Sequence, residues 1–177
     1  MSIARAVKKK LDEYLDGRAY CYIMHLNYNT RTDEDRRMHW TYGKDHRLIG
    51  LDRFDVNTDW NCKSDIEKAK FRSQFPQWYS QFEMFCNEMT RNDLIIAMAG
   101  YDLFLGFGTV NQDGYNYDPK LKVDRTFFDH TRQMDWVMAL DYDRRIRLSE
   151  PLKGFNRTLL KIDPNHKYWK ILANVEV

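Results

Sequence analysis

The sequence predicts an α+β fold in which a curved, mixed, barrel-like β-sheet is flanked by helices. Strand-like runs outnumber helical ones along the chain, which favours a sheet-centred architecture. Two apolar runs, 93–99 and 103–110, are separated by three turn residues, the spacing of a β-hairpin. A length of 177 residues suits one domain with its own hydrophobic core. We therefore expect a single domain over residues 1–177.

The N-terminal segment predicts a helix followed by a strand. Ile3, Val7 and Leu11 recur at helical spacing, so residues 2–16 are expected to form an amphipathic helix. The apolar run 19–26 predicts a strand. A polar, charged loop is expected over 27–37, followed by a short extended piece around Trp40 and a further strand over 47–51.

A helical insert is expected over 64–90. Ser64 and Glu67 have the spacing of a capping box, in which each side chain satisfies a free backbone N–H of the other, so a helix should begin there. Pro76 either interrupts this helix or starts a second one. One apolar stripe follows at helical spacing and is expected in the core: Trp78, Phe82, Phe85 and Met89.

The C-terminal half predicts further strands. Gly106 and Gly108 alternate with larger residues, so one face of their strand has no side chains and something must approach it closely. Runs 132–140, 144–148 and 158–162 are expected as strands. A final helical turn should carry Tyr168, Trp169 and Ile171.

Charge and cysteine usage limit the class of protein. The formal net charge is +2, but residues 119–177 carry 12 basic and 8 acidic side chains, while residues 1–118 carry 16 basic and 18 acidic ones. A modest basic surface of this kind suits phosphate contacts, and equally a solvated face. The three cysteines form no CxxC pair, and neither a signal peptide nor a membrane-length apolar run is present. We expect a reduced, cytoplasmic protein without membrane attachment.

The motifs of several enzyme classes are absent. The chain has no GxxxxGK[ST] loop, no HExxH and no GxSxG. Its five histidines form no ligand cluster with the cysteines, so no metal and no cofactor are expected. The stretch Asp118-Pro119-Lys120 offers the acid-x-lysine element of metal-dependent nucleases, although proline there favours a turn. A nuclease is retained as an alternative function.

The order of several short motifs resembles a known superfamily. YCYIMHLNYN, then HWTY, NDLIIAMAGYDLFLGFGTV, GYNYDP and RQMDWV follow one another over residues 19–172 in the order seen in PUA-like proteins, within them the EVE and YTH domains. Asn92-Asp93 stands where these families usually have Gly-Asp. The ending HTRQMDW is similar to domains at the N-terminus of McrB-type modification-dependent restriction proteins. The resemblance implies a PUA-like fold, and a GTPase motor and a McrC-like nuclease partner in a full-length parent.

The resemblance also implies a function, which is to flip a base out of its strand into an aromatic pocket and read its modification. It implies a pocket built from six residues: Trp40, Tyr42, Asn27, Tyr28, Tyr115 and Tyr117. We expect a non-catalytic specificity domain for modified DNA, with N6-methyladenine favoured over 5-methylcytosine. An RNA-binding PUA-like domain is the first alternative. A core position for Trp40 also stays open.

Backbone contacts are expected from the basic C-terminal third. The candidate cations are Lys120, Lys122, Arg125, Arg132, Arg144 and Arg145. Each phosphate contact made by such a side chain would add about one unit to the salt dependence of binding.

Overall fold

The computed structural model describes residues 2–13, 19–26, 32–51, 53, 56–123, 128–152, 158–163 and 165–174. Its helices are α1 (Ile3–Glu13), α2 (Asp33–Asp45), η1 (Trp60–Cys62), α3 (Asp65–Gln74), α4 (Pro76–Glu83), the π-helix η2 (Met84–Glu88), α5 (Lys120–Val123), η3 (Tyr142–Arg144) and α6 (Tyr168–Ala173). Its strands are β1 (Cys21–His25), β2 (Leu48–Leu51), β3 (Leu94–Ala99), β4 (Leu103–Val110), β5 (Asn116–Tyr117), β6 (His130–Ala139), β7 (Ile146–Arg147) and β8 (Leu159–Ile162).

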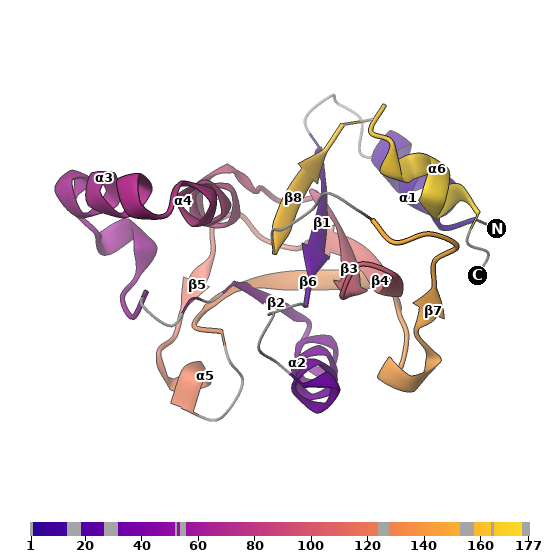
Figure 1. The fold of residues 1–177 in the computed structure, drawn as a ribbon, viewed down its shortest axis with the longest axis horizontal. Helices are drawn as coiled ribbons and strands as arrows, with labels where there is room; N and C mark the ends of the chain where they lie inside the picture. Colours follow the sequence, from indigo (N-terminus) through magenta and orange to yellow (C-terminus); the bar gives the residue numbers. More distant parts are fainter. Residues whose placement is uncertain are drawn as a thin grey trace.

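The strands form one mixed, curled sheet, as the sequence predicts. Its order is β2-β6-β4-β3-β1-β8, with β5 attached to β6 and β7 to β4. Strands β1 and β3 run parallel, and β3 and β4 form the expected antiparallel hairpin. Figure 1 shows the sheet curled between helices, with α3 and α4 at one end, α1 and α6 at the other, and α2 beneath. The α+β class with a half-barrel sheet is confirmed.

The two faces of the sheet are covered by different helices. On one face, α1 and α6 cover an apolar cluster built on Ile23, Ile96 and Phe107. On the other face, two clusters lie side by side. One packs under α4 and η2 around Phe82, and the other packs under α2 around Trp40. Alternation along β3 decides this division, because successive strand residues point to opposite faces.

Helix α2 corrects a prediction. Residues 33–37 of the expected charged loop and the expected extended piece around Trp40 are helical, since α2 runs from Asp33 to Asp45, while residues 27–31 of that loop lie outside the described residues. A reciprocal capping box starts α2, in which Asp35 N–H donates to Thr32 Oγ1 over 3.2 Å and Thr32 N–H donates to Asp35 Oδ2 over 2.9 Å. The acidic first turn adds a favourable interaction with the helix dipole. The expected loop was wrong because aspartate here fills the place usually held by glutamate.

The predicted helical insert is confirmed. Both halves of the Ser64–Glu67 capping box are present, and Pro76 begins a second helix. Phe82, Phe85 and Met89 are buried, while Trp78 is half-buried at the edge of the same cluster. The insert therefore covers one end of the sheet.

The glycines of β4 meet a neighbouring strand rather than a covering helix. A Cβ at Gly106 would lie 2.3 Å from the Met138 carbonyl oxygen, and one at Gly108 would lie 2.5 Å from the Asp135 carbonyl oxygen. The close approach expected from the sequence is thus the backbone of β6, at the register shift beside Gly108. The expected strand 144–148 is only partly correct, since η3 occupies its start and β7 is two residues long.

Candidate nucleic-acid interface

Trp40, the first expected pocket wall, lies in the core. Its side chain is 2% exposed, and its Nε1–H donates to the Leu140 carbonyl oxygen over 2.7 Å. Its ring meets Trp136 edge to face, with centroids 5.2 Å apart. The alternative that the sequence left open, a core tryptophan, is therefore what the structure has. Tyr42, two residues on, is half-buried and packs on the exposed His46 ring at 4.1 Å.

Tyr115 and Tyr117 meet at a different ring. Both pack on His130, with centroids 5.6 and 4.9 Å away. The Tyr115 hydroxyl donates to Asp59 and accepts from Asn61 N–H, and the Tyr117 hydroxyl donates to the Asn57 carbonyl oxygen over 2.8 Å. The two tyrosines therefore fasten the segment before α3 to the sheet. The structure brings them together with each other, and Trp40 together with Trp136.

Burial and hydrogen bonding shift the pKa values of Tyr115 and Asp59. Burial raises the pKa of Tyr115, and its bond to Asp59 raises it further. Burial works against the charged form of Asp59, but bonds from Tyr115 and from Asn61 N–H outweigh it and hold its pKa below the usual range. The carboxylate is therefore kept as an acceptor.

Asn27, Tyr28 and Arg125 lie outside the described residues, and so does the side chain of Lys122.

Three polar atoms on the face under α2 and α4 are buried without a hydrogen-bond partner in the described part of the chain. They are Tyr22 Oη, His130 Nε2 and Trp136 Nε1. Each atom belongs to, or borders, the aromatic cluster under α4, and Trp136 also contacts the cluster under α2. We call the line where these two clusters meet at Trp136 the seam. Buried polar groups normally have partners, so each of these three atoms needs an explanation.

His130 is held by its neighbour in the chain. Its Nδ1 lies 2.7 Å from Asp129 Oδ1, and both side chains are almost fully buried. Phe82 lies edge-on to the ring at 5.2 Å. The carboxylate orients the imidazole and leaves Nε2 toward the aromatic cluster. Sequence analysis did not single out this pair.

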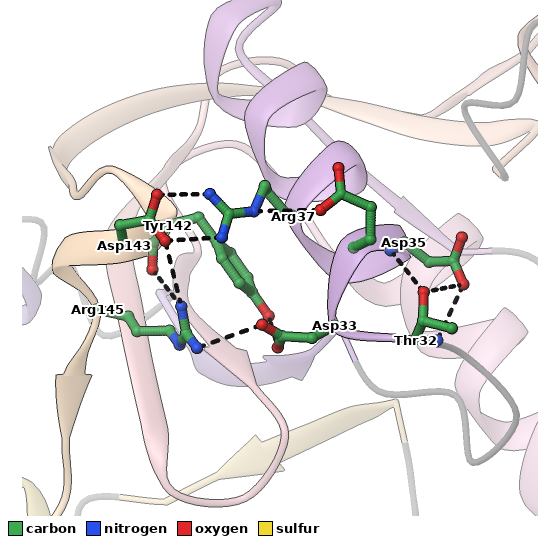
Figure 2. Close-up of polar contacts among 8 residues, drawn as sticks. Thr32, Asp33, Asp35, Arg37, Tyr142, Asp143 and Arg145 are labelled. Atoms are coloured by element: carbon green, nitrogen blue, oxygen red, sulfur yellow. Dashed lines mark hydrogen bonds and ion pairs between the residues drawn. The ribbon is translucent and has the colours of Figure 1, made fainter.

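A polar network docks α2 onto η3 (Figure 2). Arg37 Nη2 donates to Asp143 Oδ1 over 2.7 Å, and the Tyr142 hydroxyl donates to Asp33 Oδ1 over 2.6 Å. Arg145 lies 3.4 Å from Asp33. Hydrogen bonding to Arg37 lowers the pKa of Asp143, while burial and the bond to Asp33 raise the pKa of Tyr142 to about 12. Much of this network is exposed, so each ion pair contributes little, but together they orient α2.

Arg132, an expected phosphate contact, is an internal clamp instead. It is 1% exposed, and its guanidinium donates to three carbonyl oxygens, those of Phe85 (2.6 Å), Gly114 (2.5 Å) and Cys86 (3.2 Å). Burial lowers its pKa. It joins the π-helix η2 to the loop that carries Tyr115. Because it is buried, it does not reach a phosphate in this structure.

The remaining expected cations divide. Arg145 is occupied by Asp33 and by the Tyr142 carbonyl oxygen, whereas Arg144 and Lys120 are exposed. Lys120 N–H donates to Asp118 Oδ1 over 2.9 Å, which makes Asp118-Pro119-Lys120 a turn at the start of α5.

No group of three or more histidine, cysteine, aspartate or glutamate side chains among the described residues is arranged to hold a metal ion. Within the same residues, no helix is both long and apolar enough to cross a membrane.

The model of a family described as Domain of unknown function (DUF8426) matches residues 23–160. No curated protein matches the chain.

Proposed function

We propose, for a chain that belongs to the DUF8426 family of domains of unknown function, that it is a non-catalytic DNA-binding domain that reads a modified base. The fold expected for this role is PUA-like, of the EVE/YTH type, and the curled sheet flanked by helices is compatible with it. N6-methyladenine is the favoured mark, ahead of 5-methylcytosine. In a full-length McrB-type parent, a GTPase motor and a McrC-like nuclease partner would act on the bound DNA.

The observation that carries the proposal is the buried Trp136 Nε1–H at the seam, which has no hydrogen-bond partner among the described residues. An unpaired buried donor or acceptor costs about 1–3 kcal/mol, so a ligand that pairs with it recovers that free energy. A flipped base brings ring nitrogens and exocyclic groups of both kinds, together with a flat face for the surrounding rings. Trp136 Nε1–H is the donor best placed for such a ligand, because its ring joins the two clusters.

The pocket proposed here differs from the one expected from sequence. Trp40 supports Trp136 from behind, and Trp136 replaces it as the ring nearest the base. Stacking a base on an aromatic ring contributes about 1–3 kcal/mol, which offsets much of the few kcal/mol needed to unstack it from the duplex.

Discrimination between marked and unmarked bases requires a penalty as well as a contact. Burying one methyl group contributes about 0.8 kcal/mol, or roughly fourfold in affinity. An amine proton left without a partner in a dry pocket costs about 1–3 kcal/mol more. The two terms together give about 1.8–3.8 kcal/mol, so the preference for the marked base should lie between about twentyfold and several hundredfold.

Binding to a matched panel of oligonucleotides tests the proposal. The panel holds one DNA sequence, as single strand and as duplex, with no mark, N6-methyladenine or 5-methylcytosine, and the same sequence in RNA. Fluorescence anisotropy should give the tightest binding to marked DNA. Equal affinity for all marks would refute modified-base reading, and preference for RNA would favour the RNA-binding alternative.

Trp136→Phe tests the seam directly. This variant keeps a ring but removes the N–H that has no partner in the described protein, so stability should change little, while affinity for marked DNA should fall by about 1–3 kcal/mol. Trp40→Phe is the matched control, since it removes an N–H that is already bonded to Leu140. It should cost more stability than Trp136→Phe and lower the affinity for marked DNA less.

A further inference from the structure

The cations of this protein differ in whether they are already paired. Around α2 and β7, four cations contact carboxylates: Arg37 with Asp143, Lys44 with Asp141, Arg145 with Asp33, and Arg147 with Asp102. A cation held in this way must give up its partner before it can bind a phosphate. The side of the molecule around α2 is therefore a poor surface for a polyanion.

The end of the molecule where α1 and α6 pack carries cations that form no ion pair with a carboxylate of the described residues. Among the described residues, five basic side chains on α1, on β8 and at α6 lie in no ion pair: Arg5, Lys8, Lys161, Lys167 and Lys170. Lys8 lies 5.4 Å from the Trp169 ring centroid, and Lys161 lies 3.3 Å from that of Tyr20. We call these five side chains the basic face.

The basic face is continuous across two helices. Helices α1 and α6 pack against each other, as Figure 1 shows, near both ends of the chain. A shallow hollow of about 490 Å³ between them is lined by Arg5, Lys8 and Lys9 together with Trp169, and no acidic side chain of the described residues lines it. A second hollow, of about 300 Å³, is also lined by Trp169, together with Lys161, Tyr20 and the acidic Asp163.

The structure favours nucleic acid over a lipid surface as the occupant. A basic amphipathic helix such as α1 can also lie on a membrane, but it then needs its apolar side for the acyl chains. In this protein Ala4 and Val7 are buried in the core cluster under α1 and α6. The exposed side chains of α1 among the described residues are basic, namely Arg5, Lys8 and Lys9, and their charge complements a phosphodiester backbone.

We propose that the basic face binds the phosphodiester backbone of DNA, at the end of the molecule where α1 and α6 pack against each other. The identification of DNA rests on the proposed function. The face supplies affinity that is independent of sequence and of base modification, while the seam supplies discrimination. It takes the place of the backbone contacts that the sequence assigned to Arg132 and Arg145.

Salt dependence of binding tests the basic face. The variant Arg5→Gln/Lys8→Gln/Lys170→Gln removes three of its cations. Each lost phosphate contact lowers the slope of log K against log salt by about 0.9, so the slope should fall by nearly three units. At 0.1 M salt each contact accounts for about eightfold in affinity by the same relation. Marked and unmarked duplexes should weaken alike.

A matched control separates a local face from net charge. Lys63→Gln/Lys70→Gln/Arg72→Gln makes the same change in charge before and within α3, at the far end of the molecule in Figure 1. This variant should keep the wild-type slope. Equal weakening by both variants, or an unchanged slope in the first, would overturn the basic face.

The outcomes also distinguish this proposal from the proposed function. If wild-type protein binds marked and unmarked duplex equally but only the α1/α6 variant flattens the slope, modified-base reading fails and the basic face stands. If discrimination persists with unchanged slopes, the reverse holds. Vesicles of phosphatidylserine and phosphatidylcholine provide a last arm, because loss of vesicle binding without loss of DNA binding would reassign the face to a membrane.

Discussion

Replacing Trp40 by alanine should destabilise the protein rather than remove a binding contact alone. The indole is 2% exposed and packs against Trp136, and its N–H is bonded to the Leu140 carbonyl oxygen. Truncating a buried tryptophan to alanine costs about 3–5 kcal/mol, because it removes the buried apolar surface and leaves a cavity. For a chain of this length each kcal/mol lowers Tm by about 2–4 °C, so the expected loss is about 6–20 °C.

Two further variants separate the causes. Trp40→Phe keeps most of the buried ring but loses the hydrogen bond to Leu140, and should cost about 1–2 kcal/mol. Tyr42→Ala removes a half-buried ring on the same helix and should cost less than Trp40→Ala. Urea unfolding with a fitted m-value gives the free energies, and binding is compared at a temperature where every variant is folded.

The opposite result would refute the core position. If Trp40→Ala unfolds within about 1 kcal/mol of wild type and loses the 1–3 kcal/mol expected of a stacked base, Trp40 is a pocket wall, as the sequence resemblance implies.

Three other perturbations follow from the structure. Arg132→Met should lower the free energy of unfolding by about 2–4 kcal/mol, since three carbonyl oxygens lose a charged donor. As a control, Arg144→Met at an exposed position should change it by less than about 0.5 kcal/mol. If Arg132→Met is as stable as wild type and flattens the salt dependence of binding, Arg132 contacts a phosphate after all. Burial lowers the pKa of His25 from 6.5 to about 3, so the unfolded state binds a proton below pH 6.5 that the folded state does not. The free energy of unfolding should therefore fall by about 2 kcal/mol between pH 7 and 5. His25→Phe should flatten this pH dependence, whereas His46→Phe, at an exposed position, should leave it unchanged. Equal pH dependence in the two variants would contradict the role of His25. Gly106→Ala should lower the midpoint of urea unfolding, because its Cβ would lie 2.3 Å from a carbonyl oxygen of β6. An unchanged midpoint would mean that β6 can move aside.

Local sequence signals determined much of this fold. The Ser64–Glu67 capping box and the turn between β3 and β4 act over a few residues, so their spacing predicts them without knowledge of the rest of the chain. Gly106 and Gly108 likewise predict a close backbone approach, but only the structure identifies β6 as the neighbouring backbone. The capping box of Thr32 and Asp35 is also a local signal, and it predicts a helix where a loop was expected.

Only the tertiary structure decided which of the candidate binding residues are exposed and unpaired, and could therefore contact a ligand. Arg132 resembles any other basic residue in the sequence, and its carbonyl partners at Phe85 and Cys86 lie 47 and 46 residues away. In the sequence, Trp40 follows a charged segment and resembles the wall of a pocket. In the structure, helix α2 packs its ring against Trp136. The sequence also does not predict that Arg5 and Lys8 lie in no ion pair, because an ion pair depends on which carboxylate the fold brings within about 4 Å and not on net charge. Sequence specifies such chemistry locally, whereas burial and pairing depend on contacts between distant parts of the chain.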